Sequence, residues 1–120
     1  MLTKISLENI LFLDIETVPE HDNFDALDPT KKELWAHKTQ YQRKEDFSPE
    51  EFYDRAGIWA EFGMIVCISV GYFTFKGNTR SFRVTSIHGE EKDLLNEFKN
   101  LLETHYNEPY KLLCGHNAKE

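Results

Sequence analysis

Two carboxylates, Asp14 and Glu16, directly follow an apolar stretch over residues 10–13. Side chains alternate faces along a β-strand, so residues two apart point the same way, roughly 6.5–7 Å apart along the backbone. Two same-side acids at the end of an apolar strand can hold a divalent metal ion, because hard cations prefer carboxylate oxygens. Two solvated acids at a strand end are the alternative, and the pair alone does not decide between them.

Length and composition predict one folded domain that is not a passive nucleic-acid binder. The chain has 120 residues, of which 40% are hydrophobic and 13% aromatic, which favours a packed core over disorder. The 14 basic and 21 acidic side chains give a net charge of −7, whereas a passive binder needs a broad basic surface to neutralise phosphates. An enzyme that collects carboxylates around cations is compatible with this charge.

The sequence predicts a cytoplasmic location. No apolar stretch approaches the ~20 residues that cross a bilayer, and the first residues lack the apolar segment and cleavage site of a secretory signal. Cys67 and Cys114 lie in apolar runs without metal-ligand spacing, so we expect two reduced, buried thiols rather than a disulfide or a zinc site.

The first half of the chain predicts a central strand followed by a helical insertion at about 20–62. Residues 10–13 form the strand, and Pro19 ends it because proline cannot donate to a ladder. Asp28 or Thr30 beside Pro29, and Ser48 before Pro49, are candidate helix caps, which predicts helices at about 29–42 and 49–60. We expect the apolar side chains of these helices to pack onto something larger: Leu34, Trp35, Phe52 and Trp59. The basic side chains of this segment predict a solvated face rather than a phosphate contact: Lys31, Lys32, Lys38, Arg43 and Lys44.

The second half predicts an antiparallel hairpin, an amphipathic helix and a short strand. A β-branched, aromatic run over 64–75 indicates a buried strand, and residues 76–78 indicate a turn. Residues 80–87 alternate, with Phe82 and Val84 on one face. Leucines at helical spacing predict a helix over about 90–106, and a strand follows over 110–114. The predicted class is therefore α/β with a mixed sheet.

Two segments resemble motifs of the DEDD superfamily of 3′–5′ exonucleases, which is also called DnaQ-like. Phe12-Leu13-Asp14-Ile15-Glu16-Thr17 resembles the first exonuclease motif, and residues 112–120, Leu-Leu-Cys-Gly-His-Asn-Ala-Lys-Glu, resemble the start of the second. Residues 61–72 resemble the second strand of the branch related to the exonuclease domains of family B DNA polymerases. The second motif of that branch runs His-Asn-x-x-x-Phe-Asp, which His116 and Asn117 match at its first two positions.

The resemblance implies an RNase H-like fold of three antiparallel strands, then a helix and a parallel strand, truncated after this fourth strand. It implies two Mg²⁺ or Mn²⁺ ions held by four acids. Asp14 would bridge both ions, and Glu16 would hold the ion that activates water. Thr17, His116 and Asn117 would contact the substrate, which is the 3′ end of a single-stranded nucleic acid, DNA rather than RNA.

The chain departs from the family pattern because it carries only two of the four acids. The second-motif aspartate and the whole third motif are absent from the sequence. Asn117 and Glu120 resemble the start of a helix that has no body. We therefore expect residues 1–120 to be the N-terminal portion of a single exonuclease-like domain, with little or no nuclease activity alone.

Two other functions fit parts of the sequence. A haloacid-dehalogenase-like phosphatase also opens with an apolar strand and two acids, with Asp14 as nucleophile, but Glu16 stands where that family normally has Asp. A non-catalytic interaction module on the same fold is the second alternative. Base stacking is conceivable for four aromatic side chains that we expect mainly in the core: Trp35, Tyr41, Phe52 and Trp59.

Overall fold

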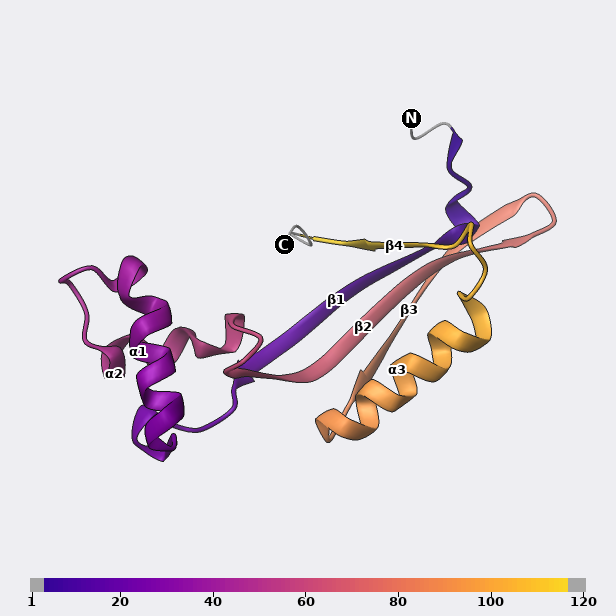
Figure 1. Cartoon of the computed structure of the whole chain (residues 1–120). Helices are drawn as coiled ribbons and strands as arrows, with labels where there is room; N and C mark the ends of the chain where they lie inside the picture. The colour runs from indigo at the N-terminus through magenta and orange to yellow at the C-terminus, as the bar shows by residue number, and fades with distance from the viewer. Residues whose placement is uncertain (1–3, 117–120) are drawn as a thin grey trace. The chain divides into compact units, whose positions relative to one another are not determined.

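The computed structural model describes residues 4–116 and divides into two compact units. The first unit comprises Met1–Glu16 and Ile65–Glu120, and the second comprises Thr17–Met64. The second unit covers the segment for which the sequence predicts a helical insertion. Figure 1 shows the elements of both units, which are described separately below.

A four-stranded mixed sheet organises the first unit. Its strands are β1 (Ile10–Pro19), β2 (Gly63–Lys76), β3 (Thr79–His88) and β4 (Leu112–Gly115), in the order β3-β2-β1-β4. β2 and β3 form the predicted antiparallel hairpin around Gly77, whose φ of 61° suits a turn glycine. β1 pairs with β4 in parallel. The predicted α/β class and the internal position of β1 are therefore confirmed.

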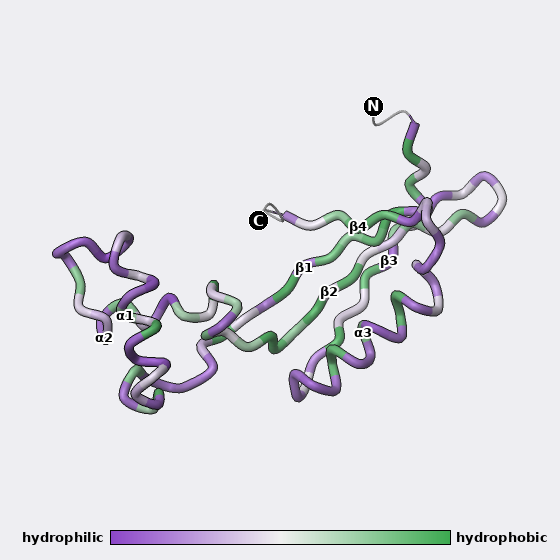
Figure 2. Tube along the Cα trace, in the orientation of Figure 1, coloured by the Kyte–Doolittle hydropathy of each residue, from purple (hydrophilic) through white to green (hydrophobic). Residues whose placement is uncertain are grey.

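One face of this sheet is buried under α3 (Glu91–His105). Leu11 from β1, Val70 from β2 and Leu94 from α3 are each no more than 1% exposed. Figure 2 shows apolar and polar residues alternating along α3, as its amphipathic prediction requires. The Glu91 carboxylate accepts a hydrogen bond of 2.6 Å from the Ile65 N–H, which ties the start of the helix to β2.

The opposite face of the sheet carries an aromatic cluster. The rings of Phe12, Phe73 and Phe82 lie with centroids 4.9–6.0 Å apart. Phe82 is 50% exposed and Val84 65% exposed, because no described helix of the first unit packs on this side. The alternation predicted for β3 is correct, but these two residues are not core residues.

The second unit has its own core, centred on Trp35. Its elements are a 3₁₀ turn η3 (Phe24–Ala26), α1 (Pro29–Arg43), α2 (Pro49–Phe52) and a 3₁₀ helix η4 (Tyr53–Ile58). Trp35 is fully buried, and its ring centroid lies 5.0–6.2 Å from four aromatic rings: Phe52, Tyr53, Trp59 and Phe62. The expectation that these residues pack onto something larger is wrong, since Trp35, Phe52 and Trp59 pack on one another, and Leu34 is 56% exposed.

Both predicted caps are present, but the second predicted helix differs from expectation. Asp28 accepts from the Lys31 N–H at 2.8 Å, and Ser48 forms a capping box with Glu51. After one α-helical turn the backbone tightens into η4. A 3₁₀ helix aligns side chains three apart, and this places both Tyr53 and Ala56 in the core. Along the described residues, no helix combines the length and the apolar character that a bilayer crossing requires.

The basic side chains of α1 are engaged within the second unit. Lys31 pairs with Glu20 at 2.7 Å, and Lys38 pairs with Glu61. Arg43 is buried and donates to the Thr39 hydroxyl at 2.9 Å and to two backbone carbonyls. The prediction of a solvated face is therefore wrong for Arg43, which is buried in the second unit, while Lys31 and Lys38 form ion pairs at its surface.

Replacing Trp35 by alanine should unfold the second unit. Large aromatic-to-alanine changes in a core cost about 3–5 kcal/mol, a large share of the stability of a small domain. Guanidinium unfolding followed by Trp59 fluorescence would measure the loss. Tyr41→Ala is the control, because Tyr41 is 67% exposed on the same helix. Equal midpoints for the two variants would contradict this core.

Acid should weaken the second unit through Glu61. The hydrogen bond from Lys38 holds the pKa of this carboxyl below its ordinary 4.5. A lowered folded pKa contributes stability above 4.5 that is lost as the pH falls through the folded value. The contribution is small because the pair is exposed. We expect Glu61→Gln to reduce the loss of thermal stability between neutral pH and pH 3, while Glu33→Gln leaves it unchanged. Identical pH profiles for both variants would exclude this role.

Candidate functional site

The acid pair lies within an internal strand and not at its end as predicted, because β1 continues past residue 13 to Pro19. Asp14 and Glu16 have the same strand parity as Phe12, so they face away from the core beneath α3. Both acids are exposed. The Asp14 carboxylate accepts a hydrogen bond of 3.1 Å from the Ile15 N–H, which leaves most of its lone pairs available to a ligand.

β4 brings the end of the second motif beside the first. In the parallel pairing, Leu13 lies opposite Gly115, so His116 follows at the level of Asp14. Both residues line a hollow of about 450 Å³ on this face of the first unit. Asp14 and His116 therefore come together just past the last residue pair of the parallel β1–β4 ladder, while β1 itself continues to Pro19.

The walls of this hollow come from the β2–β3 hairpin and were not predicted as site residues. They include Ser69, Gly71, Phe82 and Val84. The Phe82 ring lies directly over Gly71, since a Cβ at position 71 would stand 2.4 Å from its Cζ. The Ser69 hydroxyl lies 2.9 Å from that of Ser86. Period-two alternation combined with the hairpin register could have placed these residues on the face of Asp14.

The donors at this site suit a hard divalent cation, but they are few. Asp14 and Glu16 offer carboxylate oxygens exposed to water, the ligand type that Mg²⁺ and Mn²⁺ prefer. Among residues 4–116, no group of three or more His, Cys, Asp or Glu side chains lies together as a metal site. A cation held here would thus keep several water ligands.

Among the described residues, the predicted site residues Glu16 and Thr17 do not line this hollow. Thr17 is half-buried and belongs to the second unit. Asn117 lies outside the described residues, as does Glu120 with its predicted helix cap. Their contact with substrate stays a prediction.

The prediction of two buried thiols is wrong. Both cysteines are free, but Cys67 is only half-buried and Cys114 is exposed in the hollow beside Asp14. All four residues of β4 are exposed, because this strand forms the edge of the described sheet. The cytoplasmic assignment stays a prediction.

Comparisons of the chain with protein-family models, with curated proteins and with solved structures give no match. The exonuclease resemblance therefore rests on the motif residues, and the fold is defined here by its strand order and pairing.

Thiol labelling should distinguish the two cysteines. Cys114 is exposed at the edge of the sheet, whereas Cys67 lies half-buried within β2. We expect a maleimide to modify Cys114 first, as measured by peptide mass spectrometry over time. Cys114→Ser should remove the fast phase, and Cys67→Ser should preserve it. A fast phase that depends on Cys67 would contradict the exposed position of β4.

Proposed function

We propose that this chain contributes the first motif and the start of the second motif of a metal-dependent 3′–5′ exonuclease with an RNase H-like fold. The observation that supports this best is the shared hollow of Asp14 and His116, which lie 102 residues apart in sequence. The sheet also agrees with what the motif resemblance implies, because three strands are antiparallel and the fourth is parallel to the internal strand that carries the two acids.

In this proposal, Asp14 and Glu16 hold Mg²⁺ or Mn²⁺ through their exposed carboxylates. When bound, such ions supply the charge that activates a water molecule and stabilises the leaving oxygen of a phosphodiester. Asp14 can hold the cation because its side chain is solvent-facing and only weakly engaged with the backbone. His116, on the neighbouring strand, can donate or accept a hydrogen bond at a substrate phosphate.

The proposed substrate is the 3′ end of a single-stranded nucleic acid, with DNA favoured over RNA. The strands β2 and β3 are compatible with this class of ligand, because residues 63–88 contain no acidic residue. A polyanion that approaches Asp14 from the hairpin side therefore meets no carboxylate from these two strands.

Hydrolysis by this mechanism needs more carboxylates than Asp14 and Glu16 supply. Two-metal sites hold a pair of ions ~3.5–4 Å apart, and the motif resemblance assigns four acids to that task. We infer that the 120-residue chain binds one divalent ion weakly and has little or no nuclease activity by itself.

A Mn²⁺ titration tests the metal role directly. Paramagnetic broadening should appear first at the amides of residues 13–16 and 114–116 of the ¹⁵N-labelled chain, with an affinity in roughly the millimolar range because few ligands are fixed. Asp14→Asn should weaken binding about tenfold, and Mg²⁺ should compete. Asp93→Asn on α3 is the matched control. Broadening elsewhere, or equal affinity in both variants, would disprove the site.

An assay with a 3′-labelled single-stranded oligonucleotide tests the reaction. We expect no release of mononucleotides by the chain alone, and metal-dependent release only when further acids complete the site. Release by residues 1–120 alone would contradict the two-acid limit. A covalent beryllofluoride adduct on Asp14 would instead favour the phosphatase. Oligonucleotide binding that survives both EDTA and Asp14→Asn would favour a non-catalytic module.

A further inference from the structure

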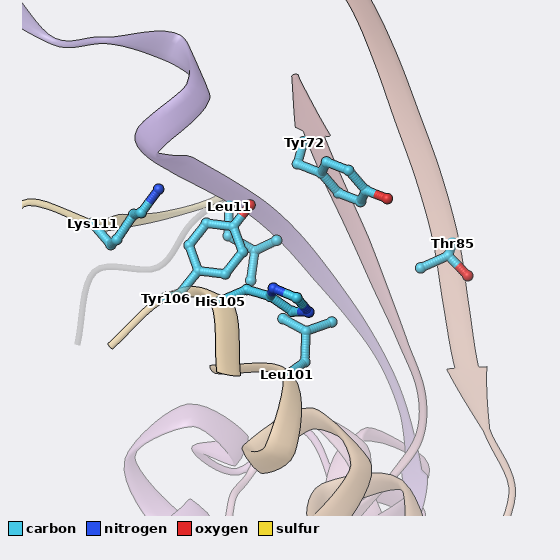
Figure 3. A pocket seen from close by; sticks show the side chains of 7 residues that line it. All are labelled: Leu11, Tyr72, Thr85, Leu101, His105, Tyr106 and Lys111. Carbon is cyan, nitrogen blue, oxygen red and sulfur yellow. The ribbon is translucent and has the colours of Figure 1, made fainter. Parts of the chain in front are cut away.

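A second pocket lies on the face of the sheet beneath α3, away from the acid pair. It has a volume of about 380 Å³, within the range of small-molecule sites. Figure 3 shows side chains from three strands, the end of α3 and the segment before β4 around one space: Leu11, Tyr72, Thr85, Leu101, His105, Tyr106 and Lys111. Because Leu11 and Phe12 point to opposite faces of β1, this pocket does not belong to the site at Asp14.

Several polar groups of this pocket are available to a ligand. The hydroxyls of Tyr72 and Tyr106 and the imidazole of His105 line it, and each can donate or accept a hydrogen bond. The Lys111 ammonium donates one hydrogen bond of 3.2 Å to the Asn9 side chain, and an ammonium has three donors. Burial raises the pKa of the Tyr106 phenol, to which nearby Tyr72 also contributes, so that phenol remains a donor at neutral pH.

Lys111 is held in place at the pocket. Its ammonium lies 5.5 Å from the ring centroid of Tyr106 and 5.4 Å from that of Tyr110. These two cation–π contacts restrict a side chain that is otherwise flexible. No carboxylate lines the pocket, which sets it apart in a chain of net charge −7.

We propose that this pocket binds a small planar aromatic molecule that carries an anionic group. The anionic group is placed at Lys111, whose ammonium would donate hydrogen bonds to it in place of water. The ring is placed against Leu101 and the tyrosine rings, which supply apolar lining of the pocket. An aromatic carboxylate and a nucleoside monophosphate share this chemistry.

Matched ligands test this assignment on the ¹⁵N-labelled 120-residue chain without metal. The probes are 2-naphthoate and AMP, their uncharged counterparts 2-naphthamide and adenosine, and the ringless anions acetate and inorganic phosphate. We expect at least one aromatic anion to shift the amides of His105, Tyr106 and Lys111. It should bind about tenfold more tightly than its uncharged counterpart, because one charge-assisted hydrogen bond contributes about that much. Tighter binding of 2-naphthoate would indicate an aromatic carboxylate as the ligand, and tighter binding of AMP would indicate a nucleoside monophosphate.

Two pairs of variants assign the effect to these side chains. Lys111→Met should abolish the tenfold preference, whereas Lys99→Met, at an exposed lysine of α3, should preserve it. Tyr106→Phe should weaken binding several-fold, while Tyr110→Phe should not, because Tyr110 contacts Lys111 without lining the pocket. If Lys111→Met fails to fold, the comparison of Tyr106→Phe with Tyr110→Phe still tests the proposal, because each variant removes only a hydroxyl.

Three results would overturn the proposal: no aromatic anion shifts these amides, the uncharged partner binds equally well, or Tyr106→Phe and Tyr110→Phe behave alike. None of them bears on Mn²⁺ binding at Asp14. The proposed nuclease site and this pocket can therefore fail independently.

Discussion

The alternation of side chains along β1 is the constraint on which the first unit depends. Leu11 points into the core with Val70 and Leu94, whereas Phe12 and Asp14 point to the other side. A shift of one residue in this strand would bury the carboxylate and expose the leucine, so burial of Leu11 fixes the orientation of the acids. The site is therefore positioned by apolar packing on the far face of the sheet.

Parallel pairing adds the second half of the site. A helix of 15 residues, α3, carries the chain back across the sheet so that β4 runs alongside β1. Because α3 covers Leu11 and leads into β4, His116 lies at the level of Asp14. The last turn of α3 lies beside Tyr72 and lines the second pocket with it. Core, candidate metal site and aromatic-anion pocket are consequences of one crossover.

The features predicted correctly from the sequence are those that local physics determines. Asp28 and Ser48 identify helix starts because their side chains satisfy free N–H groups of the first turn, and Gly77 identifies the hairpin. Burial was predicted less well, since exposure of Leu34 and Cys114 depends on which elements pack nearby. The pocket at Tyr106 was not predicted, because it requires the position of the end of α3 relative to three strands, β1, β2 and β3.

Electrostatics at the hollow explains why a cation would be needed there for a phosphodiester. Two like charges 4 Å apart repel by about 1 kcal/mol in bulk water and about 4 kcal/mol near a protein surface, so Asp14 and Glu16 alone disfavour a phosphate. The hairpin adds no further repulsion, because its contribution to the walls is uncharged: Ser69, Val70, Gly71, Phe82 and Val84. A divalent ion on the two carboxylates would therefore reverse the sign of the interaction with a phosphate, because Asp14 is the one carboxylate among the described residues that line the hollow.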